Sequence, residues 1–327
     1  INELKKNKGS TSLKFREKMS RLAFGETAYY DAVISNYFNK FNNINFPKRK
    51  ILFTNLVENL RYGENPHQIG AFYSQNIENK LEQIHGKTLS YNNYSDIFAA
   101  LTISKSLPKN TGTAIVKHGN PCGVSILKNS LDSYKSALES DPISAFGGIV
   151  SCNYKVSQKL AQMLNKIFLE VIIANGFDKK ALRILKSKKN VRLIDSSKIT
   201  FNEIWKFNSV DNFTLIQSED RKIFSKKDFR IVSKKKPNKS QLDNLMFAFN
   251  VCRYAKSNAI VLASNKSTVG IGSGQPSRLD SCEIAIDKMN KFSKIKNDIV
   301  AASDAFFPFV DGIEKLVQSG ASAIVQP

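Results

Sequence analysis

The amino-acid sequence predicts an α/β fold, because short apolar runs typical of buried strands alternate with helical patterns along the chain. Two strand-like runs are Ala114–Val116 and Val171–Ala174, and a third, Ala259–Ala263, lies later in the chain. Amphipathic helical spacing is found between these runs, as at 96–107 and 240–253. Such alternation is typical of a sheet with helices packed against it.

Length and composition describe an ordinary globular protein. The chain has 327 residues, which predicts about two domains. An apolar fraction of 42% supplies a sizeable core. No run of about 20 apolar residues exists and the first residues lack the apolar stretch of a signal peptide, so neither a membrane span nor export is predicted. The chain does not begin with Met and stops just after a strand-like run, so we expect a piece of a longer protein.

The cysteines argue against a metal site. Cys122, Cys152, Cys252 and Cys282 form no C-x-x-C pair and are too widely spaced for the usual zinc motifs. We therefore expect reduced thiols, no metal and a cytoplasmic protein.

The net charge of +21 allows three interpretations, namely nucleic-acid binding, an anionic small-molecule substrate, or a general drift of the surface toward lysine. The basic runs are scattered and are not interleaved with aromatic residues as stacking platforms would be. They are Lys5-Lys6, Lys48–Lys50, Lys186–Lys189 and Lys234–Lys236. We favour drift combined with local anion sites over nucleic-acid binding.

Other elements are predicted from the same periodicities and from turn residues. Helices are expected at 11–39, 130–138, 155–168, 179–185, 280–292 and 312–319. Strands are expected at 51–53 and 323–325, with a linker at 41–50 and glycine-rich turns at 119–123 and 268–278. The latter turn does not fit G-x-G-x-x-G, so no dinucleotide site is predicted. Residues 195–230 give no clear pattern.

The candidate catalytic stretch is Lys117-His118, directly after the strand-like run 114–116. Two ionisable side chains at a strand end suit the place where open α/β sheets hold ligands. Neighbouring residues of an extended strand point to opposite faces, so both can reach one substrate only if the chain turns between them. A plain surface turn with a neutral histidine is an equally good interpretation of this pair alone.

Two further loops are candidates for ligand contacts. Arg61-Tyr62 combines a guanidinium fork with a phenol and suits a phosphate, although a solvated turn explains it as well. Gly147-Gly148 is expected to offer backbone N–H groups to a ligand. Phe146 beside them is expected either to cover a flat ring or, more commonly for a phenylalanine, to belong to the core.

A set of motifs in fixed order carries a family resemblance. The motifs are R-Y-G-E-N-P-H-Q (61–68), G-K-x-L-S-Y-N-N (86–93), K-H-G-N-P-C-G (117–123), D-P-I-S-A-F-G-G (141–148), K-S-N-A-I (256–260), G-I-G-S-G-Q-P-S-R (270–278) and S-D-A-F-F-P-F (303–309). Together they resemble the bifunctional purine biosynthesis proteins, specifically their aminoimidazole carboxamide ribonucleotide (AICAR) formyltransferase half. The resemblance spans residues 16 to 327.

The resemblance implies a fold of two cytidine-deaminase-like α/β units in tandem, with mixed sheets flanked by helices, in a homodimer with active sites at the interface. Residues 1–40 would be the helical end of an inosine monophosphate (IMP) cyclohydrolase domain and 41–57 a linker. Residues 58–233 and 234–327 would be the two units, the second truncated. Deaminases of this fold bind zinc through H-x-E and P-C-x-x-C, and this chain lacks both patterns around His118 and Cys122.

The implied reaction transfers a formyl group from 10-formyltetrahydrofolate, as cosubstrate, to the 5-amino group of AICAR. No tightly bound cofactor is implied, and a K+ requirement is left open. His118 suits the proton acceptor, since an ordinary histidine pKa is about 6.5. Lys117 suits charge stabilisation or protonation of the folate N10, and Asn258 suits polarisation of the formyl oxygen.

The remaining site residues are carried over from the family position by position. AICAR would contact Arg61, Tyr62, Gly147, Glu170 and Lys189. The folate would contact Ile143, Phe146, Arg278, Leu279, Pro308, Phe309 and Asp311. Two alternatives stay open, which are a catalytically inactive fragment of this enzyme and, less favoured, a basic nucleic-acid-binding protein.

Overall fold

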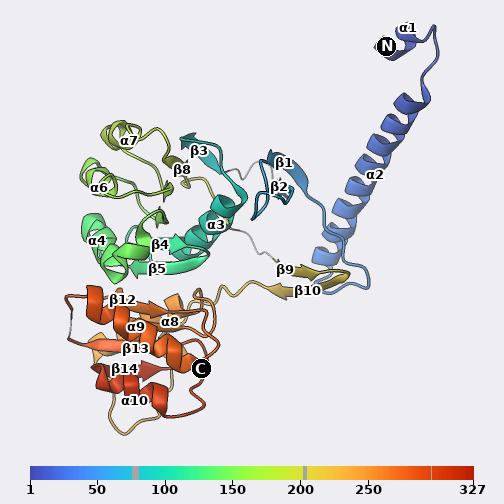
Figure 1. The fold of residues 1–327 in the computed structure, drawn as a ribbon. Helices are drawn as coiled ribbons and strands as arrows, with labels where there is room; N and C mark the ends of the chain where they lie inside the picture. Colours follow the sequence, from blue (N-terminus) through green and yellow to red (C-terminus); the bar gives the residue numbers. More distant parts are fainter. Residues whose placement is uncertain (76–80, 202–204, 296) are drawn as a thin grey trace. The chain divides into compact units, whose positions relative to one another are not determined.

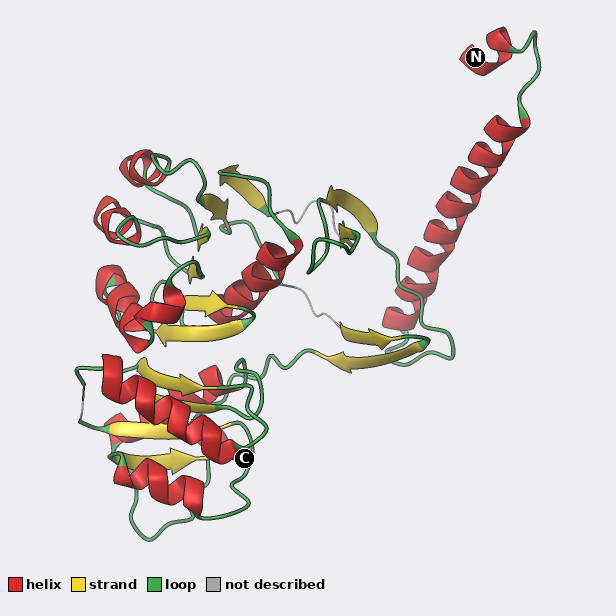
Figure 2. Cartoon of the chain, in the orientation of Figure 1, coloured by secondary structure: helices red, strands yellow, loops and turns green. Residues whose placement is uncertain are grey.

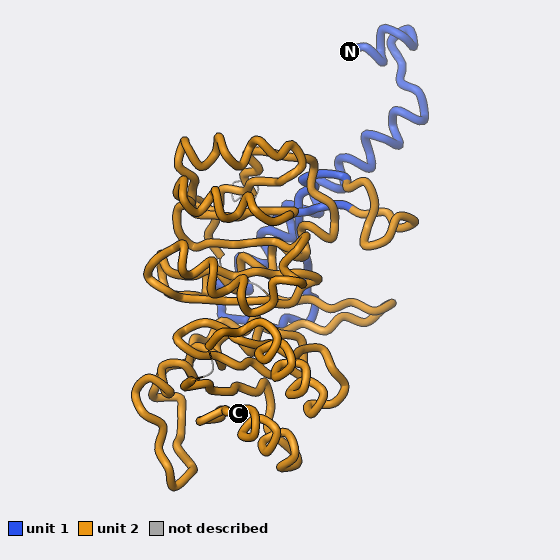
Figure 3. Tube along the Cα trace, turned by 60° about the vertical axis from the view of Figure 1, so that its left-hand side comes forward, with its two compact units in different colours: residues 1–59, 71–78 blue, residues 60–70, 79–327 orange. Residues whose placement is uncertain are grey.

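The computed structural model describes residues 1–75, 81–201, 205–295 and 297–327. The chain divides into two compact units, residues 1–59 with 71–78 and residues 60–70 with 79–327 (Figure 3). All the residues predicted to form the site belong to the second unit and lie within the described ranges.

Figure 1 labels the elements along the chain. The helices are α1 (Asn2–Lys6), α2 (Leu13–Phe41), α3 (Tyr91–Ser106), α4 (Ser130–Ser140), α5 (Pro142–Ala145), α6 (Gln158–Leu164), α7 (Lys179–Leu185), α8 (Lys239–Cys252), α9 (Arg278–Phe292) and α10 (Asp311–Gln318). The strands are β1 (Asn55–Leu60), β2 (Gly70–Ser74), β3 (Glu82–His85), β4 (Thr113–Lys117), β5 (Asn120–Ser125), β6 (Ile149–Cys152), β7 (Val171–Ala174), β8 (Arg192–Asp195), β9 (Trp205–Val210), β10 (Phe213–Ser218), β11 (Ile260–Ser264), β12 (Ser267–Gly272), β13 (Ile299–Ser303) and β14 (Ala321–Val325).

The first unit is built on the long helix α2, which confirms the helix predicted at 11–39. Its N-terminus is capped by Ser12, whose Oγ accepts a hydrogen bond from the Phe15 N–H at 3.2 Å. The strand predicted at 51–53 was wrong, because that segment lies along α2 instead of pairing. The Ile51 carbonyl accepts from Asn36 at 3.1 Å, and the strand begins only at Asn55.

The second unit is dominated by one mixed ten-stranded sheet, in the order β14-β13-β11-β12-β5-β4-β6-β7-β8-β3 (Figure 2). A separate antiparallel hairpin, β9–β10, precedes α8. The expectation of a mixed sheet flanked by helices is therefore confirmed.

The sheet consists of two halves with the same order of elements. The first half, residues 82–195, runs α3, β4–β5 hairpin, α4, β6, α6, β7, and it also contains β3 before α3, the short α5 before β6, and α7 and β8 at its end. The second half, residues 239–325, runs α8, β11–β12 hairpin, α9, β13, α10, β14. In the first half, β4 pairs antiparallel with both β5 and β6, and β6 pairs parallel with β7. In the second half, β11 pairs antiparallel with both β12 and β13, and β13 pairs parallel with β14.

The halves join where β12 lies antiparallel to β5, with Ser267 opposite Ser125. Thr268 Oγ1 accepts from the Val124 N–H at 3.0 Å, and the hydroxyls of Ser125 and Ser267 are 2.9 Å apart. All four residues are buried. The junction, called here the seam, is therefore a contact inside the sheet in which the buried polar groups hydrogen-bond to one another.

Helices cover both faces of the sheet. Alternate strand residues such as Val116 and Val261 pack in one cluster with α3 and α8. Their neighbours Ile115 and Ile260 face the opposite side, where α4, α6 and α7 cover the first half and α9 and α10 the second (Figure 1). This is the period-two alternation expected of strands buried on both faces.

The glycine-rich turns predicted at 119–123 and 268–278 were wrong in part, because the first prediction overlaps β5 from Asn120 onward and the second overlaps β12 up to Gly272, whereas 273–277 is a loop that leads into α9 as predicted. Asn120–Ser125 is β5 and Ser267–Gly272 is β12. The glycines there serve close packing of a helix on the sheet. A Cβ on Gly123 would lie 1.8 Å from the Ala137 carbonyl oxygen in α4, and one on Gly272 would lie 1.9 Å from that of Ser281 in α9.

The other predicted elements are confirmed with shifted ends, most clearly at 155–168, where α6 covers only Gln158–Leu164. The four cysteines are buried free thiols, and burial raises the pKa of Cys122 and Cys152 to about 12. Among the described residues, no helix is long and apolar enough to cross a membrane.

We predict that Gly272→Ala lowers the free energy of unfolding by about 3 kcal/mol or more, because the new Cβ overlaps the α9 backbone. Urea denaturation measures this change. Gly274→Ala is the matched control two residues away, where a Cβ meets only the Lys256 side chain at 3.9 Å and φ is +73°. Its cost should be about 1 kcal/mol. Equal costs for the two substitutions would contradict the close packing of α9 on β12.

Candidate active site

The candidate site lies along one edge of the ten-stranded sheet, called here the site edge. In the first half, Val116 pairs with Ile149, and Ile149 with Val171. The end of β4 therefore lies beside the starts of β6, β7 and β8. In the second half, Ile260 pairs with Gly272 and Ser303, so the start of β11 and the ends of β12 and β13 reach the same edge.

This topology gathers residues that are far apart in sequence. Lys117 ends β4 and His118 follows it, Gly147 precedes β6, Glu170 precedes β7, Lys189 precedes β8, and Asn258 precedes β11. Arg278 and Leu279 open α9 beyond β12, whereas Pro308, Phe309 and Asp311 follow β13. The parallel strands β6, β7 and β8 begin at this edge, whereas the parallel strands β13 and β14 end there, because the second half is reversed where β12 lies antiparallel to β5.

Lys117 and His118 lie at a two-residue hairpin turn. His118 and Gly119 have φ angles of 53° and 71°, a conformation typical of tight hairpins. The Asp96 carboxylate of α3 accepts from both turn amides, at 3.1 Å from His118 and 2.6 Å from Gly119. His118 is exposed to solvent. The Lys117 ammonium donates a hydrogen bond to the Phe146 carbonyl at 2.7 Å.

The turn is connected directly to the second half. Asn120, two residues after His118, accepts at its Oδ1 from the Lys256 N–H at 3.0 Å. Lys256 in turn precedes Asn258 by two residues. One hydrogen bond thus joins the two chain segments that carry the predicted catalytic residues.

The side chain of Asn258 makes three hydrogen bonds within the described part of the chain. Its Nδ2 donates to the carbonyls of Gln275 at 2.9 Å and Pro276 at 2.8 Å, while Oδ1 accepts from Arg278 at 2.7 Å. Both amide hydrogens are therefore already used by main-chain oxygens. The predicted donor role of Asn258 requires a substrate oxygen to replace one of them.

Arg278 is anchored by a carboxylate that the sequence did not single out. It forms an ion pair with Asp304, whose carboxylate also accepts from Ser257 and from the Ala259 N–H at 3.1 Å. Burial opposes ionisation, but the hydrogen bonds from Ser257, Arg278 and Ala259 outweigh it, so the pKa of Asp304 is lowered.

Glu170 is fixed in a similar way in the first half. Its Oε2 accepts from Asn93 at 2.7 Å and lies 3.6 Å from an Arg192 guanidinium nitrogen. Burial lowers the pKa of Arg192, Glu170 raises it, and the positive charge of Arg61 lowers it further. Arg61 and Arg192 are therefore close enough for their charges to interact. Arg192 has 15% of its side chain exposed and was not among the site residues predicted from the sequence.

The predicted anion-binding residues Arg61 and Tyr62 contact each other. The Arg61 guanidinium donates to the Tyr62 hydroxyl at 2.9 Å and lies 4.6 Å from the centre of its ring. The segment is attached to α3 through a bond of 3.2 Å from Asn92 to the Glu64 carbonyl. Lys189 is exposed in the turn before β8.

Gly147 and Gly148 do not offer their N–H groups to a ligand, so that expectation was wrong. Gly147 donates to the Phe168 carbonyl at 2.8 Å and Gly148 to that of Ala145 at 3.0 Å, because the chain turns here into β6. Gly147 has a φ of 72°, which explains the need for glycine.

Apolar rings are exposed along the same edge. Phe146 is 59% exposed and its ring lies 5.4 Å from that of Phe168, so the alternative that Phe146 belongs to the core was wrong. Ile143 and Phe309 are also exposed, the latter at 72%, and Phe306 beside it was not predicted. Exposed rings of this kind suit a flat aromatic ligand.

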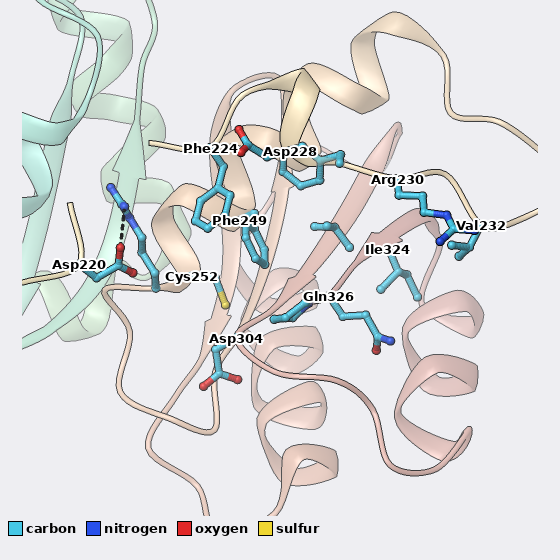
Figure 4. Close-up of a pocket in the computed structure, with 14 residues that line it drawn as sticks. Asp220, Phe224, Asp228, Arg230, Val232, Phe249, Cys252, Asp304, Ile324 and Gln326 are labelled. Atoms are coloured by element: carbon cyan, nitrogen blue, oxygen red, sulfur yellow. Dashed lines mark hydrogen bonds and ion pairs between the residues drawn. The ribbon is translucent and has the colours of Figure 1, made fainter. Parts of the chain in front are cut away.

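A pocket of about 540 Å³ adjoins the site in the second half (Figure 4). Phe224, Phe249 and Cys252 line one part of it and Ile324 and Gln326 another. It shares only Asp304 with the contacts described above, so the predicted catalytic residues lie outside it. Among the described residues, no cluster of His, Cys, Asp and Glu has the arrangement of a metal site.

The fold and the site edge define a class: an α/β protein whose mixed sheet presents paired cations, a fixed carboxylate and exposed rings at its strand ends. A family model described as AICARFT/IMPCHase bienzyme matches residues 1–288. The chain therefore belongs to the AICARFT/IMPCHase bienzyme family, a family of purine biosynthesis, and the resemblance stated from the motifs is confirmed.

Several curated relatives agree. The bifunctional purine biosynthesis protein PurH of Aquifex aeolicus is 41% identical over 328 residues, which is 99% of this chain and 64% of the relative. The PurH proteins of Thermoanaerobacter sp. (strain X514) and Leptospira biflexa are each 42% identical, over 100% of this chain and 64% of their own length. The chain thus spans about 64% of the length of these relatives.

We predict that Asp96→Ala lowers the free energy of unfolding by about 2 kcal/mol, because two charge-assisted hydrogen bonds to the turn amides are lost at a partly exposed site. Asp96→Asn keeps one acceptor oxygen and should cost about half as much. Chemical denaturation of the three proteins gives both values. Wild-type stability in Asp96→Ala would mean that the carboxylate does not hold the turn.

Asp304→Asn should destabilise the chain by about 2 kcal/mol at pH 7, because Arg278 loses its buried counter-charge. The folded pKa of Asp304 lies below the unfolded value of about 3.9. Its stabilising contribution is therefore present above that pH and is lost as the pH falls through the folded pKa. Unfolding free energies measured from pH 7 to pH 3 should converge for wild type and variant. Asp287→Asn, at an exposed position of α9, is the control, and a pH-independent difference would contradict the ion pair.

Proposed function

We propose that this chain carries AICAR formyltransferase activity, the transfer of a formyl group from 10-formyltetrahydrofolate to the 5-amino group of AICAR. The single observation that carries the proposal is the 3.0 Å hydrogen bond from Lys256 to Asn120, which unites the Lys117-His118 turn with the Asn258 segment at one edge. Membership of the family supports it, because the relatives are named bifunctional purine biosynthesis proteins.

The nucleotide would be held by the first half and its neighbouring loop. Arg61, Tyr62 and Lys189 supply donors and positive charge for a phosphate. The fixed carboxylate of Glu170 suits sugar hydroxyls, which are donors. Gly147 lets the substrate approach the backbone closely. We add Arg192 to this group, because it shares the electrostatic environment of Arg61 and Glu170.

The folate would be held by exposed apolar groups. Ile143 and Phe146 from the first half, with Leu279, Pro308 and Phe309 from the second, would cover its rings. Arg278 and Asp311 would provide polar contacts. Arg278 is already paired with Asp304 and Asn258, so its main contribution would be to hold Asn258 rather than to bind a free carboxylate.

The chemistry moves one proton and one formyl group. The amino nitrogen of AICAR attacks the formyl carbon, which then loses its bond to N10 of the folate. The amine gives its proton to His118, and N10 takes up a proton as it leaves, so tetrahydrofolate and formyl-AICAR result. The Lys117 ammonium has donors beyond the one bonded to Phe146, and these would stabilise the oxyanion or protonate N10.

The finer structural expectations belong to the same proposal. The repeated order of elements in the two halves supports two cytidine-deaminase-like units in tandem. Domain limits at 1–40, 41–57, 58–233 and 234–327, a homodimer with sites at its interface, a K+ requirement and a cytoplasmic location stay predictions. IMP cyclohydrolase activity would depend on the part of the relatives that this chain does not span.

We predict that the chain releases tetrahydrofolate from 10-formyltetrahydrofolate only when AICAR is present. His118→Ala and Lys117→Met should each lower kcat by about 100-fold or more, because a proton acceptor and a cation are lost at the reacting atoms. Lys109→Met, an exposed lysine in the turn before β4, is the matched control and should keep wild-type kinetics.

Calorimetric binding of AICAR separates the alternatives if turnover is absent. Micromolar binding that is lost in Arg61→Ala would indicate an inactive fragment with an intact nucleotide site. No AICAR binding, together with salt-dependent binding of random duplex DNA, would replace the proposal with a nucleic-acid-binding function driven by the charge of +21.

A further inference from the structure

A buried ion pair connects the two halves on the face covered by α4 and α9. The Lys288 Nζ of α9 lies 2.8 Å from the Asp141 Oδ2, which follows α4. Only 3% of the Asp141 side chain and 32% of the Lys288 side chain are exposed. Neither residue has a place in the proposed chemistry.

Asp141 uses its second oxygen on the segment that leads to the site. Its Oδ1 accepts from the Ser144 N–H at 2.9 Å and so caps α5. The chain continues from α5 to Phe146, whose carbonyl accepts from the Lys117 ammonium at 2.7 Å. A shift of Asp141 would therefore move the acceptor of Lys117 and the exposed side chains of Ile143 and Phe146.

The partner helix holds the other part of the site. Arg278, the first residue of α9, donates to the Asn258 Oδ1 at 2.7 Å. Lys288 lies ten residues later on the same helix, about 15 Å along its axis. A single rigid helix thus contacts the Asn258 segment at its start and the Asp141 segment near its end.

We propose that Lys288 is a positioning residue, which through Asp141 sets the place of segment 142–147 relative to Asn258. The inference rests on the proposed formyltransferase function for its kinetic consequence, but its structural consequence stands apart from that function. The two residues of segment 142–147 that are proposed to contact the folate, Ile143 and Phe146, are then held at a fixed position relative to Arg278 and Leu279.

The energetics favour a positioning role over a purely stabilising one. A buried ion pair is often no more stabilising than apolar residues of similar volume, because both charges lose their hydration. Burial opposes ionisation of Asp141, and the bonds from Lys288 and Ser144 outweigh this, so its pKa is lowered. The pair therefore keeps a charged contact of 2.8 Å between one atom of each half, at a site where an apolar contact would hold the halves together without fixing their relative position.

The experiment compares three variants with the wild type. They are Lys288→Gln, Lys288→Arg, and a neutral double variant that carries both Asp141→Asn and Lys288→Gln. Hydrogen–deuterium exchange is followed at 142–148, where each amide from Ser144 to Gly148 donates a hydrogen bond. We expect at least tenfold faster exchange in this segment for Lys288→Gln and for the double variant. In Lys288→Arg the exchange rate should equal that of the wild type. Lys291→Gln, at an exposed position near the end of α9, is the matched control.

Steady-state kinetics provide the second readout. The KM for 10-formyltetrahydrofolate should rise at least fivefold in the double variant, with kcat lowered and the KM for AICAR changed less than twofold. The double variant contains no unpaired buried charge, so it remains informative where Lys288→Gln does not fold. Unchanged exchange at 142–148 in a folded double variant would overturn the proposal. Absence of turnover in the wild type would overturn the proposed function instead, and leave the exchange result to decide the positioning role.

Discussion

The seam between β5 and β12 is the interaction on which the rest of the structure depends. It joins two similar α/β halves into one sheet through buried hydroxyl and main-chain hydrogen bonds, and these lie beside an apolar cluster that contains residues of both halves. Because the two strands run antiparallel, the start of β5 and the end of β12 fall on the same edge. The Lys117-His118 turn and the Asn258 segment become neighbours for this reason, although about 140 residues separate them.

Around that seam, fixed polar contacts position each candidate group. Asp96 holds the turn amides, Asp304 holds Arg278, and Arg278 holds Asn258. Each contact places a charge where neighbouring donors or acceptors satisfy it, which buried polar groups require. The Asn258 side chain and the main chain of the Lys117-His118 turn are thus fixed by the protein's own contacts, and fixed dipoles are a condition for electrostatic stabilisation of a transition state.

Much of the fold followed from the sequence, because helices and apolar strands have clear periodicities. The strands β5 and β12 did not, since Gly123 and Gly272 look like turn residues when their packing against α4 and α9 is unknown. At the candidate site, the motifs singled out Lys117 and His118, whose catalytic roles stay predictions. Asp96, Arg192 and Asp304 were missed, because a supporting residue is recognised only from the group it contacts in three dimensions.

Residues from both halves act on one substrate in the function proposed above. A crystal structure of the chain with AICAR bound tests it most directly. We expect the ring of AICAR to lie within hydrogen-bond distance of His118 from the first half and of Asn258 from the second, with its phosphate at Arg61. AICAR held by one half alone, or seated in the pocket lined by Phe224 and Phe249, would show that the two halves do not share this substrate.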